Sequence, residues 1–193
     1  MKHILCYGDS NTWGFQPGFG GRYPRQRRWT GVAEGLLGDG YVLLENGLNG
    51  RTTDFDDPEL PYRNGRKGFA YAMVSQKPID LLLLMLGTND LLQGRSPEQA
   101  AERLERFLSG IPLDRSKILL IAPPPVTLGA WVPSAKLIDD SRTFARLCRA
   151  FAERMGIRFA DAGKWDIPLA YDGVHFTEQG HKAFAAGLLE ELK

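Results

Sequence analysis

Three residues near the two ends of the chain have the types and the spacing that a serine nucleophile needs. Ser10 ends a Gly-Asp-Ser turn after the apolar run at residues 4–7, and Asp172 lies three residues before His175. A carboxylate at that spacing can reach the Nδ1–H of the histidine. That bond fixes the tautomer and leaves Nε2 free to take a proton from a serine hydroxyl. We therefore predict Ser10 as the nucleophile, His175 as the general base and Asp172 as the residue that orients His175.

Each of these short patterns also has an ordinary structural explanation. Gly-Asp-Ser is a common turn sequence, and Asp-x-x-His often forms only a local turn bond. The catalytic interpretation therefore depends on a fold that brings Ser10 and His175 together. We interpret Asp9, next to the serine, as a residue that braces the turn and takes no part in the chemistry.

A serine that attacks an ester also needs hydrogen-bond donors for the oxyanion that develops in the transition state. Ser10 offers its own N–H, Gly50 offers an N–H that no side chain obstructs, and Asn89 offers its side-chain amide. We predict that these three residues form the oxyanion hole. The alternatives are a loop glycine with positive φ at Gly50 and a polar strand-to-helix turn around Asn89.

The elements that must position these residues alternate between apolar runs and amphipathic segments. Predicted strands cover residues 2–7, 42–46, 79–86, 117–122 and 157–161. Predicted helices cover residues 29–37, 68–76, 97–109, 135–155 and 177–192. This repeated alternation predicts a parallel sheet with helices on both faces. The carboxyl ends of parallel strands share one edge, which brings the predicted triad and the oxyanion donors together.

Length and composition are those of one globular domain covering residues 1–193, with 43% hydrophobic and 24% charged residues. The formal net charge of +1 gives no electrostatic case for binding nucleic acid or an anionic membrane. Cys6 and Cys148 do not make a disulfide framework, and we expect both to be buried thiols. We see no signal peptide and no apolar run long enough to span a bilayer, so we expect a cytoplasmic protein.

Four segments of the chain, in this order and spacing, resemble the sequence blocks of the SGNH hydrolase (GDSL esterase/lipase) superfamily. They are Gly8-Asp9-Ser10, Gly50, Gly87-Thr88-Asn89-Asp90 and Asp172-Gly173-Val174-His175. More narrowly, residues 7–14 and 47–53 resemble the small bacterial arylesterase and acyltransferase branch. The resemblance implies a flavodoxin-like three-layer α/β/α sandwich, the triad and the oxyanion hole named above. It also implies a small-molecule ester as substrate. No cofactor or metal is expected.

Less specific signals lead to further expectations about the substrate and about assembly. We predict a short acyl pocket formed by Asn11, Trp13, Pro123, Trp131 and Val174. Asn11 occupies the position at which the motif that names the family has leucine. The alternative for Trp13, Pro123 and Trp131 is ordinary packing in the core and the loops. We expect a homo-oligomer, with the apolar loop at residues 126–132 as its contact. The basic cluster at residues 22–28 is either an ion-paired surface, a subunit contact or an attractor of anionic substrates.

Three rival functions remain open at this point. A carbohydrate O-deacetylase would use the same triad on another ester. A flavodoxin-like module that binds phosphate or flavin would need a phosphate-cradling loop where Asp9 stands. A metal-dependent phosphoesterase would have to use Asp9, Asn89, Asp172 and His175, and a single histidine at this edge is sparse for such a site.

Overall fold

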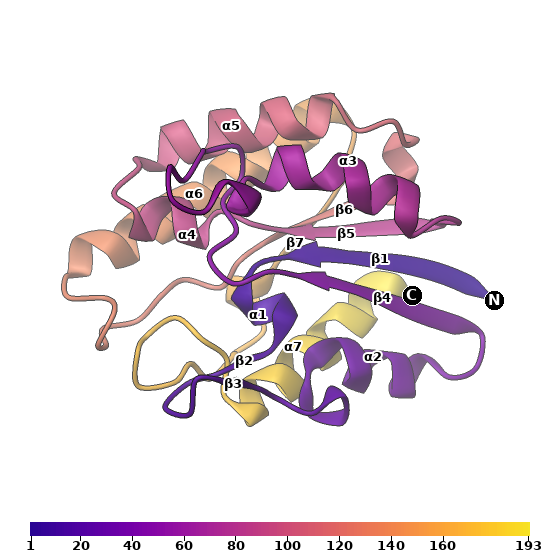
Figure 1. The fold of residues 1–193 in the computed structure, drawn as a ribbon, viewed down its shortest axis with the longest axis horizontal. Helices are drawn as coiled ribbons and strands as arrows, with labels where there is room; N and C mark the ends of the chain where they lie inside the picture. Colours follow the sequence, from indigo (N-terminus) through magenta and orange to yellow (C-terminus); the bar gives the residue numbers. More distant parts are fainter.

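The computed structural model describes all residues, Met1–Lys193, and has a five-stranded sheet at its centre (Figure 1). The strands are β1 (Lys2–Gly8), β4 (Tyr41–Gly47), β5 (Leu81–Met85), β6 (Ile118–Ala122) and β7 (Arg158–Asp161). They lie in the order β4-β1-β5-β6-β7, and every pair is parallel. The predicted parallel sheet is therefore confirmed. Its order is the flavodoxin-like one, in which the chain changes direction across the sheet between β1 and β5.

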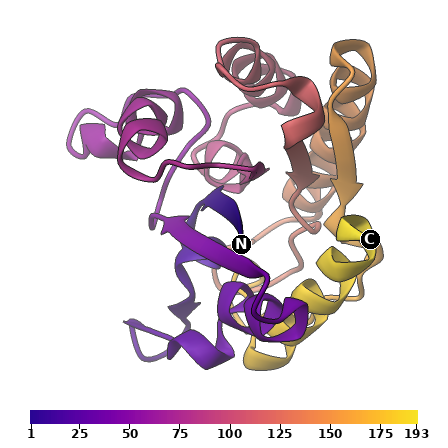
Figure 2. The same cartoon turned by 90° about the vertical axis from the view of Figure 1, so that its right-hand side faces the viewer.

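Helices cover both faces of the sheet, as the two perpendicular views show (Figures 1 and 2). Helices α2 (Trp29–Leu37) and α7 (Glu178–Leu192) lie on one face. Helices α3 (Gly65–Ser75), α5 (Pro97–Ser109) and α6 (Ala135–Met155) lie on the other. The predicted three-layer α/β/α sandwich is confirmed.

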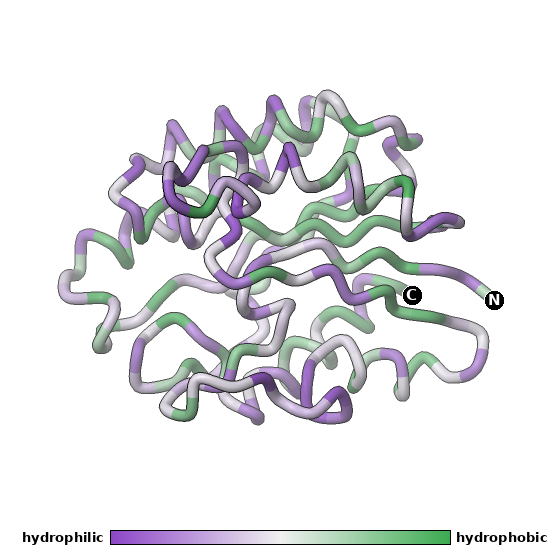
Figure 3. Tube along the Cα trace, viewed as in Figure 1, coloured by the Kyte–Doolittle hydropathy of each residue, from purple (hydrophilic) through white to green (hydrophobic).

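The apolar runs become strands because both faces of the sheet are buried. Along β1, Leu5 and Tyr7 join the core under α3, α5 and α6, whereas Ile4 and Cys6 join the core under α2 and α7. The hydropathy trace shows hydrophobic segments along the central strands (Figure 3). Both cysteines are buried free thiols, as predicted.

Local signals set the helix ends. Ser96 accepts a hydrogen bond from the Gln99 N–H, and the Gln99 side chain accepts one from the Ser96 N–H, so a capping box begins α5. Gly156, in the left-handed conformation, ends α6. The helix predicted from residue 68 begins earlier, at Gly65, because the Asn64 side chain accepts from the Lys67 N–H.

Several short elements lie outside the predicted helices and strands. Helices α1 (Ser10–Trp13) and α4 (Thr88–Leu92) follow β1 and β5 directly. Strands β2 (Phe15–Gln16) and β3 (Gly21–Arg22) form a small antiparallel hairpin between β1 and α2. Four 3-10 turns complete the chain: η1 (Arg25–Arg27), η2 (Pro61–Arg63), η3 (Arg115–Lys117) and η4 (Ala162–Lys164).

The basic cluster at residues 22–28 is ion-paired with glutamates of neighbouring elements. The pairs are Arg22–Glu45, Arg25–Glu34, Arg27–Glu178 and Arg28–Glu45. The ion-paired surface is therefore the interpretation that the structure favours. None of the helices combines the length and the apolar character needed to cross a bilayer.

Candidate active site

The structure brings the three predicted triad residues into one hydrogen-bonded row at the carboxyl edge of the sheet. The Oγ of Ser10 lies 3.0 Å from His175 Nε2, and His175 Nδ1 lies 2.8 Å from Asp172 Oδ2. All three residues are buried. Ser10 is the first residue of α1, directly beyond β1, so the end of a central strand fixes its position.

The loop that carries the acid and the base is shaped by its own hydrogen bonds. Asp172 Oδ1 accepts the N–H groups of Val174 (2.9 Å) and His175 (3.0 Å), which leaves Oδ2 for the imidazole. Gly173 has φ 79°, and a Cβ there would overlap the carbonyl oxygen of Thr127. A glycine at position 173 therefore permits the tight turn between Asp172 and His175.

The electrostatics favour an ionised aspartate beside a neutral histidine. Burial raises the pKa of Asp172, but the His175 and Val174 N–H groups and the imidazole outweigh it and hold that pKa below its ordinary value. Burial lowers the pKa of His175 from its usual 6.5, although Asp172 acts in the opposite direction. A neutral imidazole with Nδ1–H bound to Asp172 is the form that can accept a proton at Nε2.

The three residues predicted to stabilise the oxyanion, Ser10, Gly50 and Asn89, line the same cavity. As the first residue of α1, Ser10 has an N–H with no partner within its helix. Gly50 lies after β4 with φ 73°, and its N–H makes no hydrogen bond within the protein. The Asn89 amide nitrogen donates to the Arg51 carbonyl oxygen at 3.0 Å, and this bond holds the amide while its second N–H remains free.

Arg51 is a supporting residue that the sequence analysis did not single out. Its buried guanidinium donates to the carbonyl oxygens of Gly8 (2.8 Å) and Asn46 (2.5 Å), at the ends of β1 and β4. The guanidinium also lies 4.0 Å above the ring of Tyr7. The sequence signal that could have identified Arg51 is a single basic residue directly after Gly50, in the loop that follows a predicted strand.

A cavity of about 360 Å³ opens on Ser10 and contains both an aromatic and a polar part. Its lining residues are Ser10, Phe15, Asn49, Gly50, Arg63, Asn89, Gln93, Trp131 and His175. The ring centroids of Phe15 and Trp131 lie 4.6 and 4.8 Å from that of His175 and 6.4 Å from each other, so the two aromatic side chains form one group beside the imidazole. The cavity has the size and the convergent polar groups of a small-molecule site.

The predicted pocket residues do not all reach this cavity. Trp131 lines it, whereas Asn11, Trp13, Pro123 and Val174 do not. The Asn11 side chain is buried and donates to the Val174 carbonyl (3.1 Å), and Val174 packs in a small apolar cluster. Trp13 lies under the Arg22 guanidinium, and Pro123 belongs to a different, very small cavity. The structure places these four residues in packing contacts outside the lining of the Ser10 cavity.

Asp9 acts as the N-cap of α1, because its carboxylate accepts the Asn11 N–H at 3.0 Å. This agrees with the bracing role expected for it. Burial raises the pKa of Asp9 to about 6. The structure has no group of three or more His, Cys, Asp or Glu side chains placed to share a metal ion.

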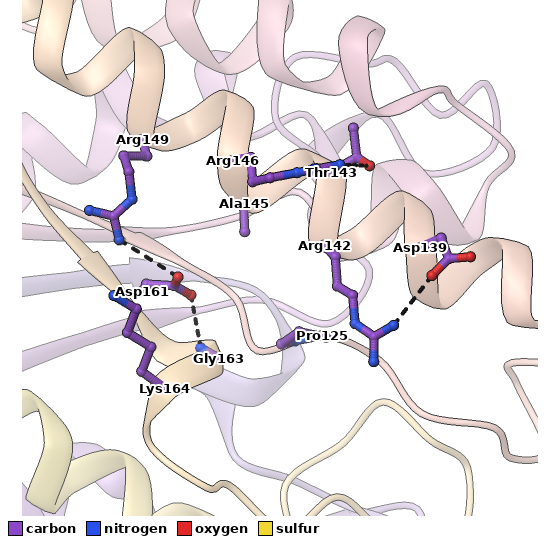
Figure 4. Close-up of a pocket in the computed structure, with 10 residues that line it drawn as sticks. All are labelled: Pro125, Asp139, Arg142, Thr143, Ala145, Arg146, Arg149, Asp161, Gly163 and Lys164. Atoms are coloured by element: carbon purple, nitrogen blue, oxygen red, sulfur yellow. Dashed lines mark hydrogen bonds and ion pairs between the residues drawn. The ribbon is translucent and has the colours of Figure 1, made fainter.

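A second cleft, of about 520 Å³, lies over α6 and η4 and shares no lining residue with the Ser10 cavity (Figure 4). It is rich in arginine, but Arg142 pairs with Asp139 and Arg149 pairs with Asp161, as the dashed lines show. It contains none of the predicted catalytic residues.

A three-layer α/β/α sandwich with serine, histidine and aspartate at the carboxyl edge of its sheet is the architecture of the SGNH hydrolase class. A family model described as the GDSL-like Lipase/Acylhydrolase family matches residues 6–183, and the chain belongs to this family of ester hydrolases. The resemblance drawn from the sequence blocks is confirmed.

Solved structures of esterases are similar to this chain over its full length. A carbohydrate acetylesterase from Sinorhizobium meliloti is 31% identical with a TM-score of 0.89, covering 100% of this chain and 98% of that one. The native aryl esterase of M. smegmatis is 32% identical with a TM-score of 0.88 and the same coverage. A curated relative, an acetylxylan esterase from Xylanibacter ruminicola, is 25% identical over 219 residues. The match covers 98% of this chain and 43% of that relative, so this chain spans less than half its length.

Proposed function

We propose that this protein is a serine esterase that hydrolyses short-chain acyl esters, aryl or alkyl, with Ser10 as nucleophile. The observation that carries the proposal is the row Ser10–His175–Asp172, with distances of 3.0 and 2.8 Å, opening on a small cavity beside unengaged N–H donors. The membership in a family of acylhydrolases supports it.

The mechanism is acyl transfer in two steps. Ser10 Oγ forms a bond to the ester carbonyl carbon while His175 Nε2 takes the hydroxyl proton. The Ser10 and Gly50 N–H groups and the Asn89 amide stabilise the oxyanion of the tetrahedral intermediate. The ester C–O bond then breaks, and the alcohol leaves with the proton from His175. In the second step His175 takes a proton from water, and the water oxygen forms a bond to the acyl carbon. The bond between the acyl carbon and Ser10 Oγ then breaks, and His175 returns the proton to Ser10 Oγ.

Two variants of this function use the same residues. A second alcohol in place of water would give acyl transfer, which the narrower sequence resemblance suggests. An acetylated carbohydrate in place of a simple ester would give an O-deacetylase, which the similarity to a carbohydrate acetylesterase and to an acetylxylan esterase favours. A phosphate-binding module is disfavoured because the Asp9 carboxylate occupies the start of α1.

We also propose that the protein self-associates near the mouth of the cavity. In the loop at residues 126–132, Val126 and Val132 are buried, but Leu128 and Trp131 are exposed. The neighbouring Tyr171 is exposed as well, and its carbonyl accepts the Ala130 N–H. A clean monomer in sedimentation velocity would refute self-association.

The test of the proposed function is hydrolysis of p-nitrophenyl acetate by the variants Ser10→Ala and His175→Ala. We expect each to lose at least about 10³-fold in kcat, because the nucleophile and its base act as one unit. Ser109→Ala, an exposed serine on α5, and His3→Ala, outside the cavity, are the matched controls and should keep the wild-type rate. Folded Ser10→Ala protein with the wild-type rate would refute the assignment.

A further inference from the structure

A third cleft, of about 710 Å³, is lined by residues of α3, of the end of α5 and of the segments that follow these two helices. Both helices lie on the same face of the sheet (Figure 1). The cleft is larger than the Ser10 cavity and shares no lining residue with it. Seven of its twelve lining residues are hydrophobic, three are basic and none is acidic. Its size and apolar lining are those of a small-molecule site, and its charge is positive.

The floor of this cleft is a row of buried apolar side chains. The rings of Phe69 on α3 and Phe107 on α5 are both buried, and their centroids lie 5.2 Å apart. Met73 and Ile111, which are buried as well, lie further along the two helices. At the rim, the Val74 side chain belongs to the lining and is 76% exposed. An apolar ligand therefore has access to a continuous apolar surface.

Two arginines at one end of the cleft converge on a single carboxylate oxygen. The Nε of Arg66 lies 2.8 Å from Asp54 Oδ2, and the Nε of Arg106 donates to the same oxygen at 3.2 Å. Asp54 is only 3% exposed, whereas the side chains of Arg66 and Arg106 are 48% and 51% exposed. The two guanidinium groups thus lie together at a position that solvent and ligands can reach.

This pair of arginines carries one positive charge more than its acidic partner balances. Asp54 is the one carboxylate with which either arginine forms an ion pair. No hydrogen bond within the protein uses the Nη atoms of Arg66 or the Nη1 of Arg106. These N–H groups can therefore bind an anion, and a carboxylate matches the planar geometry of a guanidinium group.

The arrangement of charge and apolar surface specifies the ligand. Helices α3 and α5 each connect two parallel strands and so run in the same direction, from the paired arginines toward the segments after each helix. From Arg66 to Val74, α3 extends about 12 Å, which is the span of an extended alkyl chain of roughly ten carbons. A neutral apolar ligand would leave the extra positive charge unbalanced, whereas a carboxylate on an alkyl chain satisfies both parts of the cleft.

We propose that the cleft between α3 and α5 binds a free fatty acid of medium chain length, with about ten carbons. Its carboxylate binds Arg66 and Arg106, and its alkyl chain lies over Phe69, Phe107 and Met73. This binding site is separate from the Ser10 cavity, and the proposal does not depend on the proposed esterase function.

The experiment is isothermal titration calorimetry of the wild-type protein with decanoate, at concentrations below those at which it forms micelles. Octanoate and hexanoate test the alkyl chain, and decyltrimethylammonium tests the charge on a chain of the same length. We expect one decanoate per protein chain, and affinity that falls about fourfold for each methylene removed. Decyltrimethylammonium should bind at least about tenfold more weakly than decanoate.

Two variants locate the binding in this cleft. Arg106→Gln removes one charged donor and leaves Arg66 to balance Asp54, and Val74→Glu places a negative charge at the exposed rim. Each should weaken decanoate binding by about tenfold or more. The matched controls are Arg142→Gln, an exposed arginine on α6, and Leu36→Glu, an exposed leucine on α2, and both should bind decanoate as wild type does.

The possible results decide for or against the site. Absence of decanoate binding to wild-type protein overturns the proposal, as does equal binding of decanoate and decyltrimethylammonium. Wild-type affinity in folded Val74→Glu or folded Arg106→Gln also overturns it, since decanoate would then bind elsewhere, for example in the Ser10 cavity. A dimer in sedimentation velocity that Val74→Glu dissociates, with no decanoate bound by wild type, would make the cleft an interface between copies. Because Val74 is exposed, its variant keeps the test available if Arg106→Gln fails to fold.

Discussion

His175 is the residue whose surroundings most directly determine how the proposed chemistry depends on pH. Burial beside Phe15 and Trp131 disfavours the imidazolium, and the Asp172 carboxylate favours it, with burial the stronger effect. The base is therefore neutral before substrate arrives. Asp172 then stabilises the positive charge that His175 gains when it takes the Ser10 proton.

The first prediction concerns the acid limb of the pH–rate profile. Because only neutral His175 can act as base and burial lowers its pKa, kcat/KM should fall on acidification with a midpoint below 6.5. Asp172→Asn removes the group that raises this pKa. It should move the midpoint to still lower pH and cost roughly 10³–10⁴ in kcat. A limb above pH 6.5, or a shift to higher pH in Asp172→Asn, would contradict this account of His175.

At the level of elements, α1 and the loop at residues 172–176 are joined through one side chain. Asn11 Nδ2 donates to the Val174 carbonyl oxygen at 3.1 Å, and its Oδ1 accepts the Phe176 N–H at 2.9 Å. These two bonds lie on either side of His175 and connect it to the helix that carries Ser10. The distance between nucleophile and base thus depends on Asn11, a residue predicted from the sequence to contact substrate.

The second prediction follows from that connection. Asn11→Ala leaves a buried N–H and a buried carbonyl unpaired, and should lower the free energy of unfolding by about 2–3 kcal/mol. It should also lower kcat more than it changes KM, because it displaces His175 from Ser10 and leaves the other residues of the cavity lining in place. Asn11→Asp retains the acceptor for Phe176 but sets a carboxylate oxygen against the buried Val174 carbonyl oxygen, so it should restore little of the lost activity. Urea denaturation and steady-state kinetics measure both effects. An altered KM with unchanged kcat would instead place Asn11 at the substrate.

The same elements show what the sequence could and could not predict. The five strands follow from apolar runs, and α5 follows from its cap and its periodicity. Helices α1 and α4 were missed because four or five residues carry no helical periodicity. The proximity of Ser10, Gly50, Asn89, Asp172 and His175 could be predicted because strand topology brings the ends of their strands to one edge of the sheet. The sequence did not allow us to predict the contacts of Arg51 and Phe15 or the lining of the cavity, because these depend on how the loops pack against one another.

For the molecule as a whole, the order of the strands places the proposed site where the two halves of the sheet meet, between β1 and β5. Ser10 follows β1 and Asn89 follows β5, the neighbouring strands at which the crossovers change direction. Asp90, on α4, accepts the N–H (3.1 Å) and the hydroxyl (2.6 Å) of Thr53, and so ties the loop after β4 to the exit of β5. This carboxyl group is fully buried, and burial raises its pKa to about 7, with the nearby Asp9 acting in the same direction.

The third prediction is that this buried acid makes the stability of the whole fold depend on pH. The pKa of Asp90 is about 7 in the folded protein, above the ordinary value of 3.8 that it has in the unfolded chain. The protonated Asp90 carboxyl therefore stabilises the fold fully below the unfolded pKa, and this stabilisation is lost as the pH rises through 7. Asp90→Asn keeps the acceptor for Thr53 and cannot ionise. The free energy of unfolding of Asp90→Asn minus that of wild type should therefore be larger at pH 8 than at pH 5, by on the order of 1–3 kcal/mol. Urea denaturation at the two pH values measures the change, with the exposed Asp139→Asn as control. A difference between Asp90→Asn and wild type that is the same at both pH values would show that the Asp90 carboxyl does not titrate on folding.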